Sequence, residues 1–235
     1  EKYLVIKKSL EHFGYDYFTS EARSFTPQTN IPVPPDYILA PGDEIKIILF
    51  GTNNKKYSLE VNRDGDIFIP ELGPVSVAGL SFNDLKGVVK GLVENQLLGT
   101  KVSLTLGSLK SISIFVLGEA IQPGMYSIGA LSKLTNAIFS SGGIKTTGSL
   151  RNIQLKRNGR IISDFDFYDL LLSGDTSNDV RLIEGDVVFI PPITKEVAIA
   201  GEVQRPGIYE LSEGETAQDL IRYSGNIKPK ANLNS

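Results

Sequence analysis

The sequence of 235 residues contains no cysteine and a single histidine, His12. Without cysteine there is no thiol nucleophile, no disulfide, no iron–sulfur cluster and no cysteine zinc site. One histidine excludes a multi-histidine metal site, and a histidine-containing catalytic triad would have to use a residue in an aromatic segment near the N-terminus. Enzymes and metalloproteins of these classes are therefore disfavoured before any motif is considered.

Long apolar runs and clusters of basic residues are also missing. The longest uncharged run, Ala120 to Ser132, is interrupted by proline and glycine and falls short of the ~20 apolar residues that span a bilayer. Lysine and arginine number 24 against 27 acidic residues, which gives a net charge of -3, and they cluster no further than pairs such as Lys7-Lys8. The sequence thus contains neither a membrane-spanning segment nor the basic patch typical of nucleic-acid binding.

Glycine is the residue that the chain has in excess, at 23 of 235 residues, and this favours a strand-rich fold with many tight turns. The length is sufficient for one or two compact units. Residues 1–18 predict a short helix that runs into an aromatic cluster. The prolines that follow, within residues 24–35, predict an extended linker, so the first domain is expected to begin at residue 36.

Turns, strands and one amphipathic helix are predicted in this first domain. Pro41-Gly42-Asp43 predicts a turn before a strand at residues 44–50, and Asp64-Gly65 predicts a type I′ β-hairpin. The strongest helix signal follows Ser81, an N-cap residue with an acidic residue three positions later. Its apolar residues recur at helical spacing up to Gly99, namely Leu85, Val88, Val89, Leu92, Val93 and Leu97.

An internal repeat determines the rest of the architecture. Residues 118–144 align with residues 201–227 at a constant offset of 83 without a gap. The nine identities are Gly118/Gly201, Glu119/Glu202, Pro123/Pro206, Gly124/Gly207, Tyr126/Tyr209, Ile138/Ile221, Ser141/Ser224, Gly142/Gly225 and Ile144/Ile227. Each copy predicts two turns, a Tyr-bearing strand and a short helix with a Ser-Gly stop. A hairpin at Asn158-Gly159 and a short helix near residues 166–172 are predicted between them, and the second copy is expected to be incomplete at residue 235.

Taken together, these motifs resemble the bacterial polysaccharide biosynthesis/export family, the Wza-type outer-membrane polysaccharide exporters. The segments YILAPGDEIKIILFG at residues 37–51 and VNRDGDIFIPELGPVSVAGLSFNDL at residues 61–85 are similar to its export domain. The Gly-Glu-x-x-x-Pro-Gly-x-Tyr repeats that begin at Gly118 and Gly201 are similar to SLBB domains, which are β-grasp units.

The resemblance implies an α+β fold, a small strand-rich export domain followed by tandem β-grasp (SLBB) domains, the last one truncated. The implied division is an N-terminal helix and Pro-rich linker at residues 1–35, the export domain at 36–107, a first SLBB domain at 108–193 and the start of a second at 194–235. The chain then corresponds to a fragment of a longer member that carries several SLBB units.

The function that the resemblance implies is a ring-like conduit in the periplasm and at the outer membrane of a Gram-negative bacterium. Through it a finished capsule polysaccharide or exopolysaccharide leaves the cell. The implied partners are the polysaccharide, further copies of the chain and an inner-membrane polysaccharide co-polymerase, with no nucleic acid, cofactor, metal or catalytic residue. The sequence departs from the pattern of this family in two respects. It has no cysteine for a lipid anchor at Glu1, and it has no amphipathic membrane-crossing helix beyond the last SLBB unit.

Candidate site residues can be interpreted in more than one way. Tyr126 and Tyr209, at equivalent places in the two copies, are candidate glycan contacts because an aromatic face can stack on a sugar. They could also be core residues whose hydroxyl reaches the backbone, and this we favour. Asp164, Asp166 and Asp169 are of the residue type that hydrolyses glycosides, but acids around a short helix more often cap and solvate it. A soluble carbohydrate-binding module and, less favoured, a hydrolase remain alternatives to the conduit.

Overall fold

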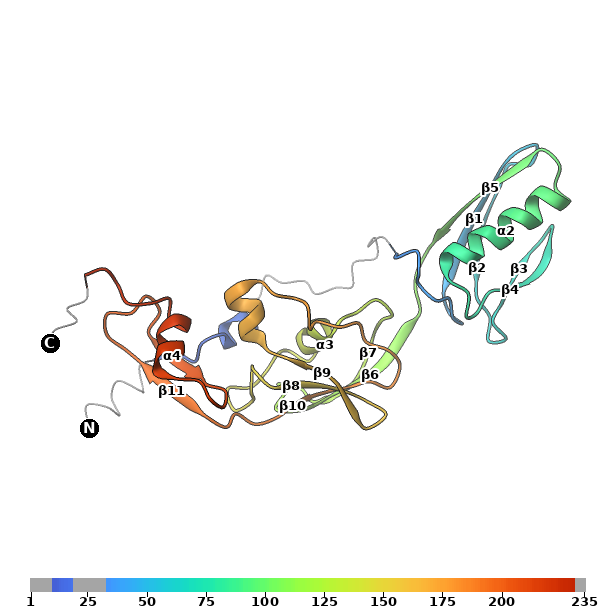
Figure 1. The fold of residues 1–235 in the computed structure, drawn as a ribbon. Helices are drawn as coiled ribbons and strands as arrows, with labels where there is room; N and C mark the ends of the chain where they lie inside the picture. Colours follow the sequence, from blue (N-terminus) through green and yellow to red (C-terminus); the bar gives the residue numbers. More distant parts are fainter. Residues whose placement is uncertain (1–9, 19–32, 231–235) are drawn as a thin grey trace. The chain divides into compact units, whose positions relative to one another are not determined.

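A computed structural model describes residues 10–18 and 33–230 of the chain. Two compact units are formed, a first unit of residues 27–112 and a second unit of residues 1–26 with 113–235. Each combines small sheets with short helices, so the α+β class expected from the sequence is confirmed (Figure 1). Among the described residues no helix has the length and apolar character to cross a membrane.

The first unit is a three-stranded antiparallel sheet covered on one face by a helix (Figure 1). The sheet has the order β2-β1-β5, built from β1 (Glu44–Gly51), β2 (Lys55–Glu60) and β5 (Thr100–Leu106). Burial alternates along β1, which places every second residue against α2 (Phe82–Gln96). The buried side chains Ile45, Ile47, Leu49, Leu85, Val89 and Val93 form this core. As predicted, the Ser81 hydroxyl caps α2 by accepting the Asp84 N–H.

The turn at Asp64-Gly65 is not the predicted type I′ hairpin. That turn requires two residues with positive φ, and only Gly65 has one, at 87°. Strand β3 (Asp66–Ile69) pairs with β4 (Gly73–Ser76) rather than with β2. The Asn62 side chain explains the difference, because its Oδ1 accepts the Asp66 N–H at 2.9 Å and closes a local turn instead.

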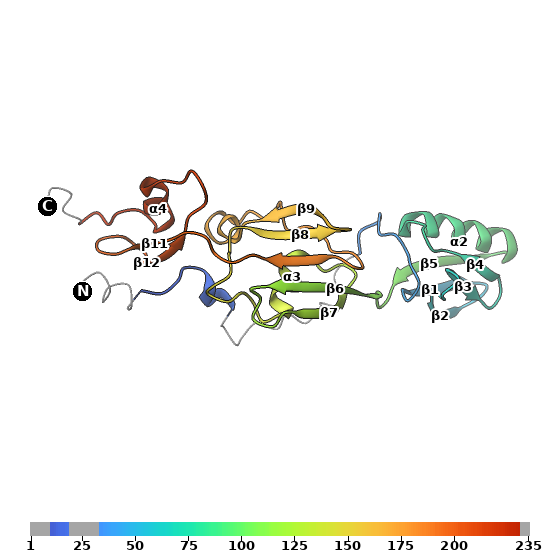
Figure 2. The same cartoon turned by 90° about the horizontal axis from the view of Figure 1, so that it is seen from below.

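The second unit contains a five-stranded sheet in the order β7-β6-β10-β8-β9 (Figure 2). Its strands are β6 (Ser111–Gly118), β7 (Gly124–Gly129), β8 (Ile153–Arg157), β9 (Arg160–Phe165) and β10 (Val187–Ile190). Asn158 and Gly159 both have positive φ, 49° and 76°, so the predicted hairpin between β8 and β9 is confirmed. The short helix predicted next is the π-helix η2 (Asp169–Ser173), and Gly174 ends it with a φ of 72°.

The two predicted copies fold alike, which confirms the repeat. Helices α3 (Leu134–Ser140) and α4 (Ala217–Tyr223) begin and end at positions 83 apart, as do the starts of β7 and β12 (Gly207–Glu210). After each helix, the hydroxyl of Ser141 or Ser224 donates to a carbonyl three residues earlier at 2.7 Å. The same backbone bridges recur, Ala120 with Ile144 and Val203 with Ile227.

Each unit also contains a buried Gly-Asp turn of one design. Asp43 and Asp186 have no exposed surface, and each carboxylate accepts the backbone N–H of the residue three positions earlier at 2.9 Å. Asp43 further accepts from the Tyr37 hydroxyl and the Lys110 N–H, whereas Asp186 forms a two-fold hydrogen bond with Arg157. Since a buried carboxylate without partners is costly, these bonds fix where the following strand begins.

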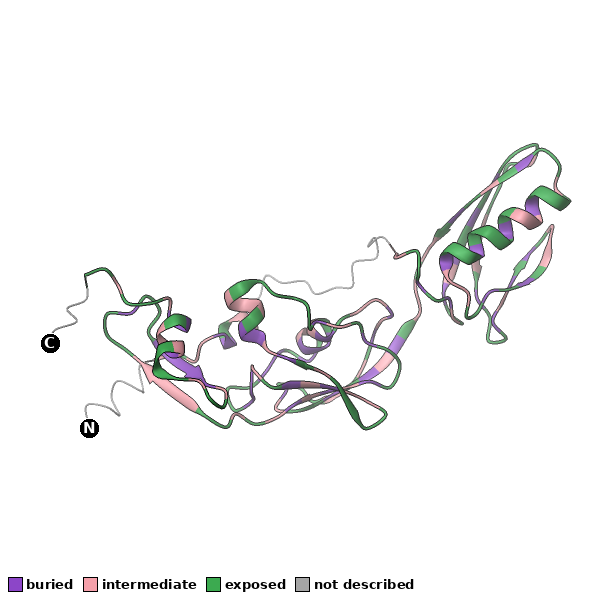
Figure 3. Ribbon diagram, in the orientation of Figure 1, coloured by how far each residue is buried: buried purple, intermediate pink, exposed green. Residues whose placement is uncertain are grey.

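Residues 10–18 do not form the helix expected near the N-terminus, and residues 1–9 lie outside the described residues. The Phe13 N–H donates to the Ile208 carbonyl and the Ile208 N–H donates to the Glu11 carbonyl, both at 2.9 Å. This segment therefore lies beside β12 in parallel, on the sheet that β12 forms with β11 (Glu196–Ile199). Only Tyr15–Phe18 is helical, as a single 3-10 turn. Figure 3 shows buried residues along the inner faces of both units.

Gly118 and Gly201 provide a matched test of the packing around the first copy. Their φ values are 84° and 96°, so alanine at either site carries left-handed strain of about 1–2 kcal/mol. At Gly118 a Cβ would also clash with the Ile190 carbonyl oxygen, whereas the space at Gly201 is open. We expect Gly118→Ala to lower the free energy of unfolding by at least about 1 kcal/mol more than Gly201→Ala in urea denaturation. Equal losses would contradict this packing.

Candidate functional site

The two repeat domains, residues 113–193 and 194–230, meet at a buried arginine. The side chain of Arg151 is 8% exposed. Its guanidinium carbon lies 4.8 Å from the ring centroid of Tyr168, in the first domain, and 5.2 Å from that of Tyr223, in the second, and the two rings meet edge to face at 5.6 Å. Cation–π contact with both rings stabilises the charge away from water.

Two carboxylates, one from each domain, complete the coordination of Arg151. Its Nε and Nη2 donate to Asp166 Oδ2 at 3.0 and 2.9 Å, and its Nη1 donates to Glu215 Oε2 at 2.5 Å. The hydroxyl of Tyr223 donates to the other oxygen of Glu215. Charge-assisted hydrogen bonds of this kind are stronger and more directional than neutral ones, so the cation joins the two domains at this point.

A third carboxylate lies beside this ion network. Glu210, on β12, accepts hydrogen bonds from the Ser149 hydroxyl at 2.6 Å and from the Leu150 N–H at 2.8 Å. Its own N–H donates to the hydroxyl of Tyr168 at 2.9 Å. All three partners belong to the first repeat domain, so β12 is bound to that domain through both its backbone and its side chain.

The environment shifts the pKa values of this junction in opposite directions. Burial raises the pKa of Asp166 and of Glu210, although hydrogen bonds oppose it at both carboxyls. Burial also disfavours ionisation of Glu215, but the hydrogen bonds from Arg151 and Tyr223 outweigh it and hold the pKa of Glu215 below its usual value. The junction is therefore an ion network held in a partly dry environment.

The N-terminal segment closes the junction from another side. Phe13 stacks on Tyr209 with 4.9 Å between ring centroids and meets the edge of Tyr168 at 5.2 Å. The hydroxyl of Tyr15 donates to the Gly148 carbonyl at 2.5 Å, and Phe18 packs on aromatic rings of the first repeat domain. Residues 10–18 thus contact both repeat domains and connect them.

The hydroxyls of Tyr126 and Tyr209 bind backbone, as the favoured interpretation requires. Each donates to the carbonyl four residues earlier, Gln122 at 2.5 Å and Arg205 at 2.8 Å. Tyr209 is buried under Phe13, whereas Tyr126 is half-buried. Contact of these rings with a glycan stays a prediction, and at Tyr209 it would require Phe13 to move away.

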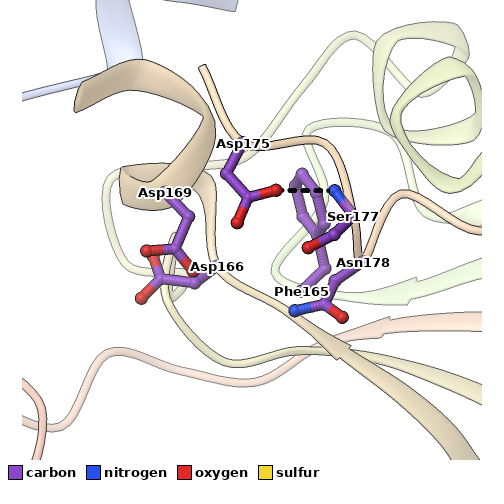
Figure 4. A pocket seen from close by; sticks show the side chains of 6 residues that line it. All are labelled: Phe165, Asp166, Asp169, Asp175, Ser177 and Asn178. Atoms are coloured by element: carbon purple, nitrogen blue, oxygen red, sulfur yellow. Dashed lines mark hydrogen bonds between the residues drawn. The ribbon is translucent and has the colours of Figure 1, made fainter. Parts of the chain in front are cut away.

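Of the acids that suggested glycoside hydrolysis, Asp164, Asp166 and Asp169, one is committed to the junction. Asp166 binds Arg151, and Figure 4 shows it with Asp169 and Asp175 around a shallow depression. The carboxylate of Asp175 accepts the Ser177 N–H at 2.8 Å. Across residues 10–18 and 33–230, no three histidine, aspartate or glutamate side chains are grouped to hold a metal ion.

Sequence reasoning did not identify the junction, because its partners are far apart along the chain. Asp166 and Glu215 lie 15 and 64 residues from Arg151. One signal was nevertheless present in the repeat alignment. The junction residues Glu210, Glu215 and Tyr223 correspond to Ser127, Ser132 and Ser140 in the first copy. Three large polar residues in place of three serines indicate a contact that only the second copy makes.

Comparison with known protein families gives three consecutive matches. Residues 31–107 match the family described as polysaccharide biosynthesis/export protein. Residues 112–190 and residues 197–235 each match the SLBB domain. The order of these domains along the chain is the order that the sequence motifs predict.

Curated relatives include export and transport proteins. The polysialic acid transport protein KpsD of Escherichia coli is 32% identical over 181 residues, which is 76% of this chain and 32% of the relative. The EPS I polysaccharide export outer membrane protein EpsA of Ralstonia solanacearum is 29% identical over 175 residues, 72% of this chain and 46% of the relative. The chain therefore spans about a third to a half of the length of these relatives.

Removing the cation tests whether the junction fixes the second repeat domain. Arg151→Gln leaves Asp166 and Glu215 without their positive partner, and breaking a buried ion pair costs about 3–5 kcal/mol. We expect a loss of about 3 kcal/mol of stability and faster amide hydrogen exchange in β11 and β12, with β8 keeping its protection. Hydrogen exchange followed by mass spectrometry measures this directly.

Two further variants serve as controls for Arg151→Gln. Arg160→Gln removes an exposed arginine at the start of β9 and should leave exchange and stability unchanged. Arg151→Lys keeps the charge but cannot bind two carboxylates in one plane, so an intermediate effect is expected. Unaltered exchange of β11 and β12 in Arg151→Gln would show that the junction does not fix this domain.

The raised pKa of Glu210 predicts a pH dependence of stability. The folded protein binds a proton at Glu210 more readily than the unfolded chain, so this group's contribution is lost as the pH rises above its ordinary pKa of 4.5. Glu210→Gln removes the dependence, and its amide can still accept from Leu150 and donate to Ser149. Thermal melts should show the variant gaining stability over the wild type from pH 4.5 towards neutrality. Parallel pH profiles for Glu210→Gln and the wild type would refute this.

Proposed function

Because this chain belongs to the polysaccharide biosynthesis/export family, with an export domain followed by SLBB domains, we propose that it forms the periplasmic part of an outer-membrane channel for capsule or exopolysaccharide. Its role there is to build the wall of the conduit. The relatives are named for transport and export, and in the proposed role this chain carries out no turnover chemistry.

The buried junction at Arg151 is the observation that supports a wall-building role. A wall needs successive domains held at a fixed angle, and here one cation, two carboxylates and three aromatic rings hold them. A buried polar network stabilises one arrangement of the domains only when each of its polar groups has a hydrogen-bond partner. The polar groups at the junction are committed to holding domains together, which leaves them unsuited to acid–base catalysis.

The physical task of such a wall is to let a hydrated polymer pass without holding it. Strong binding would retain the polymer, so contacts with the cargo must be weak and distributed. The mild net charge of -3 fits this requirement, because the surface neither strongly attracts nor strongly repels an anionic glycan.

Several finer features belong to the same proposal. The complete protein assembles as a ring of identical subunits around the path of the polymer, since closed rotational symmetry yields an enclosed channel. It lies in the periplasm at the outer membrane of a Gram-negative cell and receives its polysaccharide from an inner-membrane co-polymerase. The polysaccharide enters at one end of the ring and leaves at the other.

A soluble carbohydrate-binding module is the second candidate function. The observation that favours it is the half-buried Tyr126 beside Met125, whose side chain is exposed, on strand β7 at the edge of the five-stranded sheet. An aromatic ring on an open sheet edge can stack on a sugar. A capture module would bind its glycan tightly and reversibly, whereas a conduit needs only weak contacts with the glycan.

Deleting the corresponding gene in its native host tests the proposed export function. The polysaccharide should then remain inside the cell envelope and disappear from the cell surface, and the full-length gene should restore export. The full-length Arg160→Gln variant should restore export fully, and Arg151→Gln should restore it poorly because the wall loses its fixed angle. Normal surface polysaccharide in the deletion strain would refute the proposal.

A further inference from the structure

The open face of the sheet in the first unit carries an unusual grouping of side chains. Residues directly opposite one another on neighbouring strands point to the same face. Ile48 on β1 lies between Lys56 on β2 and Ser103 on β5, and Phe50 lies opposite Lys101 on β5. We call Lys46, Ile48, Phe50, Lys56 and Lys101 the lysine face. The opposite face of the sheet is the one that α2 covers.

Two of the three lysines on the lysine face, Lys56 and Lys101, have no acidic partner among the residues that the structure describes. Lys46, Lys56 and Lys101 are exposed and take part in none of the observed ion pairs, which involve other lysines and arginines. No acidic residue occurs in residues 45–59 or 97–110. The acids on this face are Glu44 and Glu60, beside Lys46 and at the end of the sheet away from Phe50. Hydrogen bonds from Ser58 and Ser108, together with the charge of Lys46, hold the pKa of Glu44 below its usual value. The unpaired positive charge of the face is therefore that of Lys56 and Lys101.

Apolar surface is exposed between the lysines. Ile48 is 37% exposed and Phe50 is 43% exposed. Both lie within a sheet, so their side chains present a flat apolar strip rather than a projection that could insert into a membrane. Hydroxyl groups of Ser103 and Thr105 lie beside the strip on β5. Apolar side chains can contact the apolar faces of sugars, hydroxyls can bind sugar hydroxyls, and lysines can pair with carboxylates. The surface therefore complements a polymer of sugars that carry carboxylates.

We propose that the lysine face is a contact site for an anionic polysaccharide. The lysines pair with carboxylates of the polymer, and Phe50 contacts the apolar face of a sugar ring. Charge complementarity carries the assignment, because an acidic chain with a net charge of -3 here concentrates unpaired positive charge. This inference rests on the proposed export function. It names the lysine face as a surface that contacts the exported polymer and anionic polysaccharide as the class of that polymer.

Contacts at such a surface are weak, as a conduit requires. Exposed charge pairs each contribute about 0.2–1 kcal/mol and are screened by salt. We therefore expect millimolar rather than micromolar dissociation constants, with binding that falls as the ionic strength rises. A polymer held at several such places would still slide, because no single contact holds it.

The test is an NMR titration of the 235-residue chain with oligosialic acid, a probe whose every sugar carries a carboxylate. Amide shifts should concentrate in β1, β2 and β5. Lys56→Gln combined with Lys101→Gln should weaken binding about fivefold or more. The matched control is Lys86→Gln combined with Lys90→Gln, which removes equal charge from α2 and should leave binding unchanged. Phe50→Ala should also weaken binding, without altering the chain's fold as judged by the remaining amide shifts.

Each alternative has a distinct outcome in the same titration. Shifts that are absent from the three strands, or equal binding of a neutral glucan oligosaccharide, overturn the proposal. Equal binding of polyglutamate would show a site for any polyanion, and preferential binding of phosphatidylglycerol vesicles would show a membrane surface. Micromolar binding would favour the capture module. A silent titration overturns this site alone, because the export function is tested separately by the deletion strain.

Discussion

One buried cation links the two repeat domains of the second unit. Arg151 contacts carboxylates and aromatic rings from two consecutive repeat domains, and Glu210 adds a hydrogen-bonded carboxylate nearby. In a partly dry environment each of these groups depends on the others, because an unpaired charge there is costly. Side chains of both domains therefore hold this contact, in addition to the segment that connects the domains. The proposed conduit needs such a contact, since its wall must stay open around a moving polymer.

Turns with the same hydrogen bonds also recur in different domains of the chain. Both units begin a strand at a buried Gly-Asp turn, and both repeats close a Pro-Gly turn with a tyrosine hydroxyl. The two repeats differ in how far this tyrosine is buried. Tyr209 is covered by Phe13, whereas Tyr126 remains partly open. Residues 10–18 thus distinguish two domains that otherwise share their local structure, and they add an aromatic contact to the ionic one.

Features fixed by local rules could be predicted from the sequence, and features that depend on distant partners could not. The helix after Ser81, the turn at Asn158-Gly159 and the repeat follow from periodicity and backbone geometry within a few residues. The parallel bridge between His12 and Ile208 could not be predicted, because the two residues are almost the whole chain apart. The role of Arg151 could not be predicted for the same reason, because Asp166 and Glu215 lie 15 and 64 residues away along the chain. At Asp64-Gly65 the sequence predicts a type I′ turn, but the side chain of Asn62 accepts the Asp66 N–H and a different turn forms.

The central claim is that these domains are wall segments of a closed export ring, and the mass of the assembled protein tests it most directly. Native mass spectrometry of the full-length protein, extracted in mild detergent, should show a single closed oligomer of identical subunits. Particles of one defined size, with a central opening in electron micrographs, would agree with that result. Monomers alone, under conditions in which the membrane-bound protein remains folded, would contradict it.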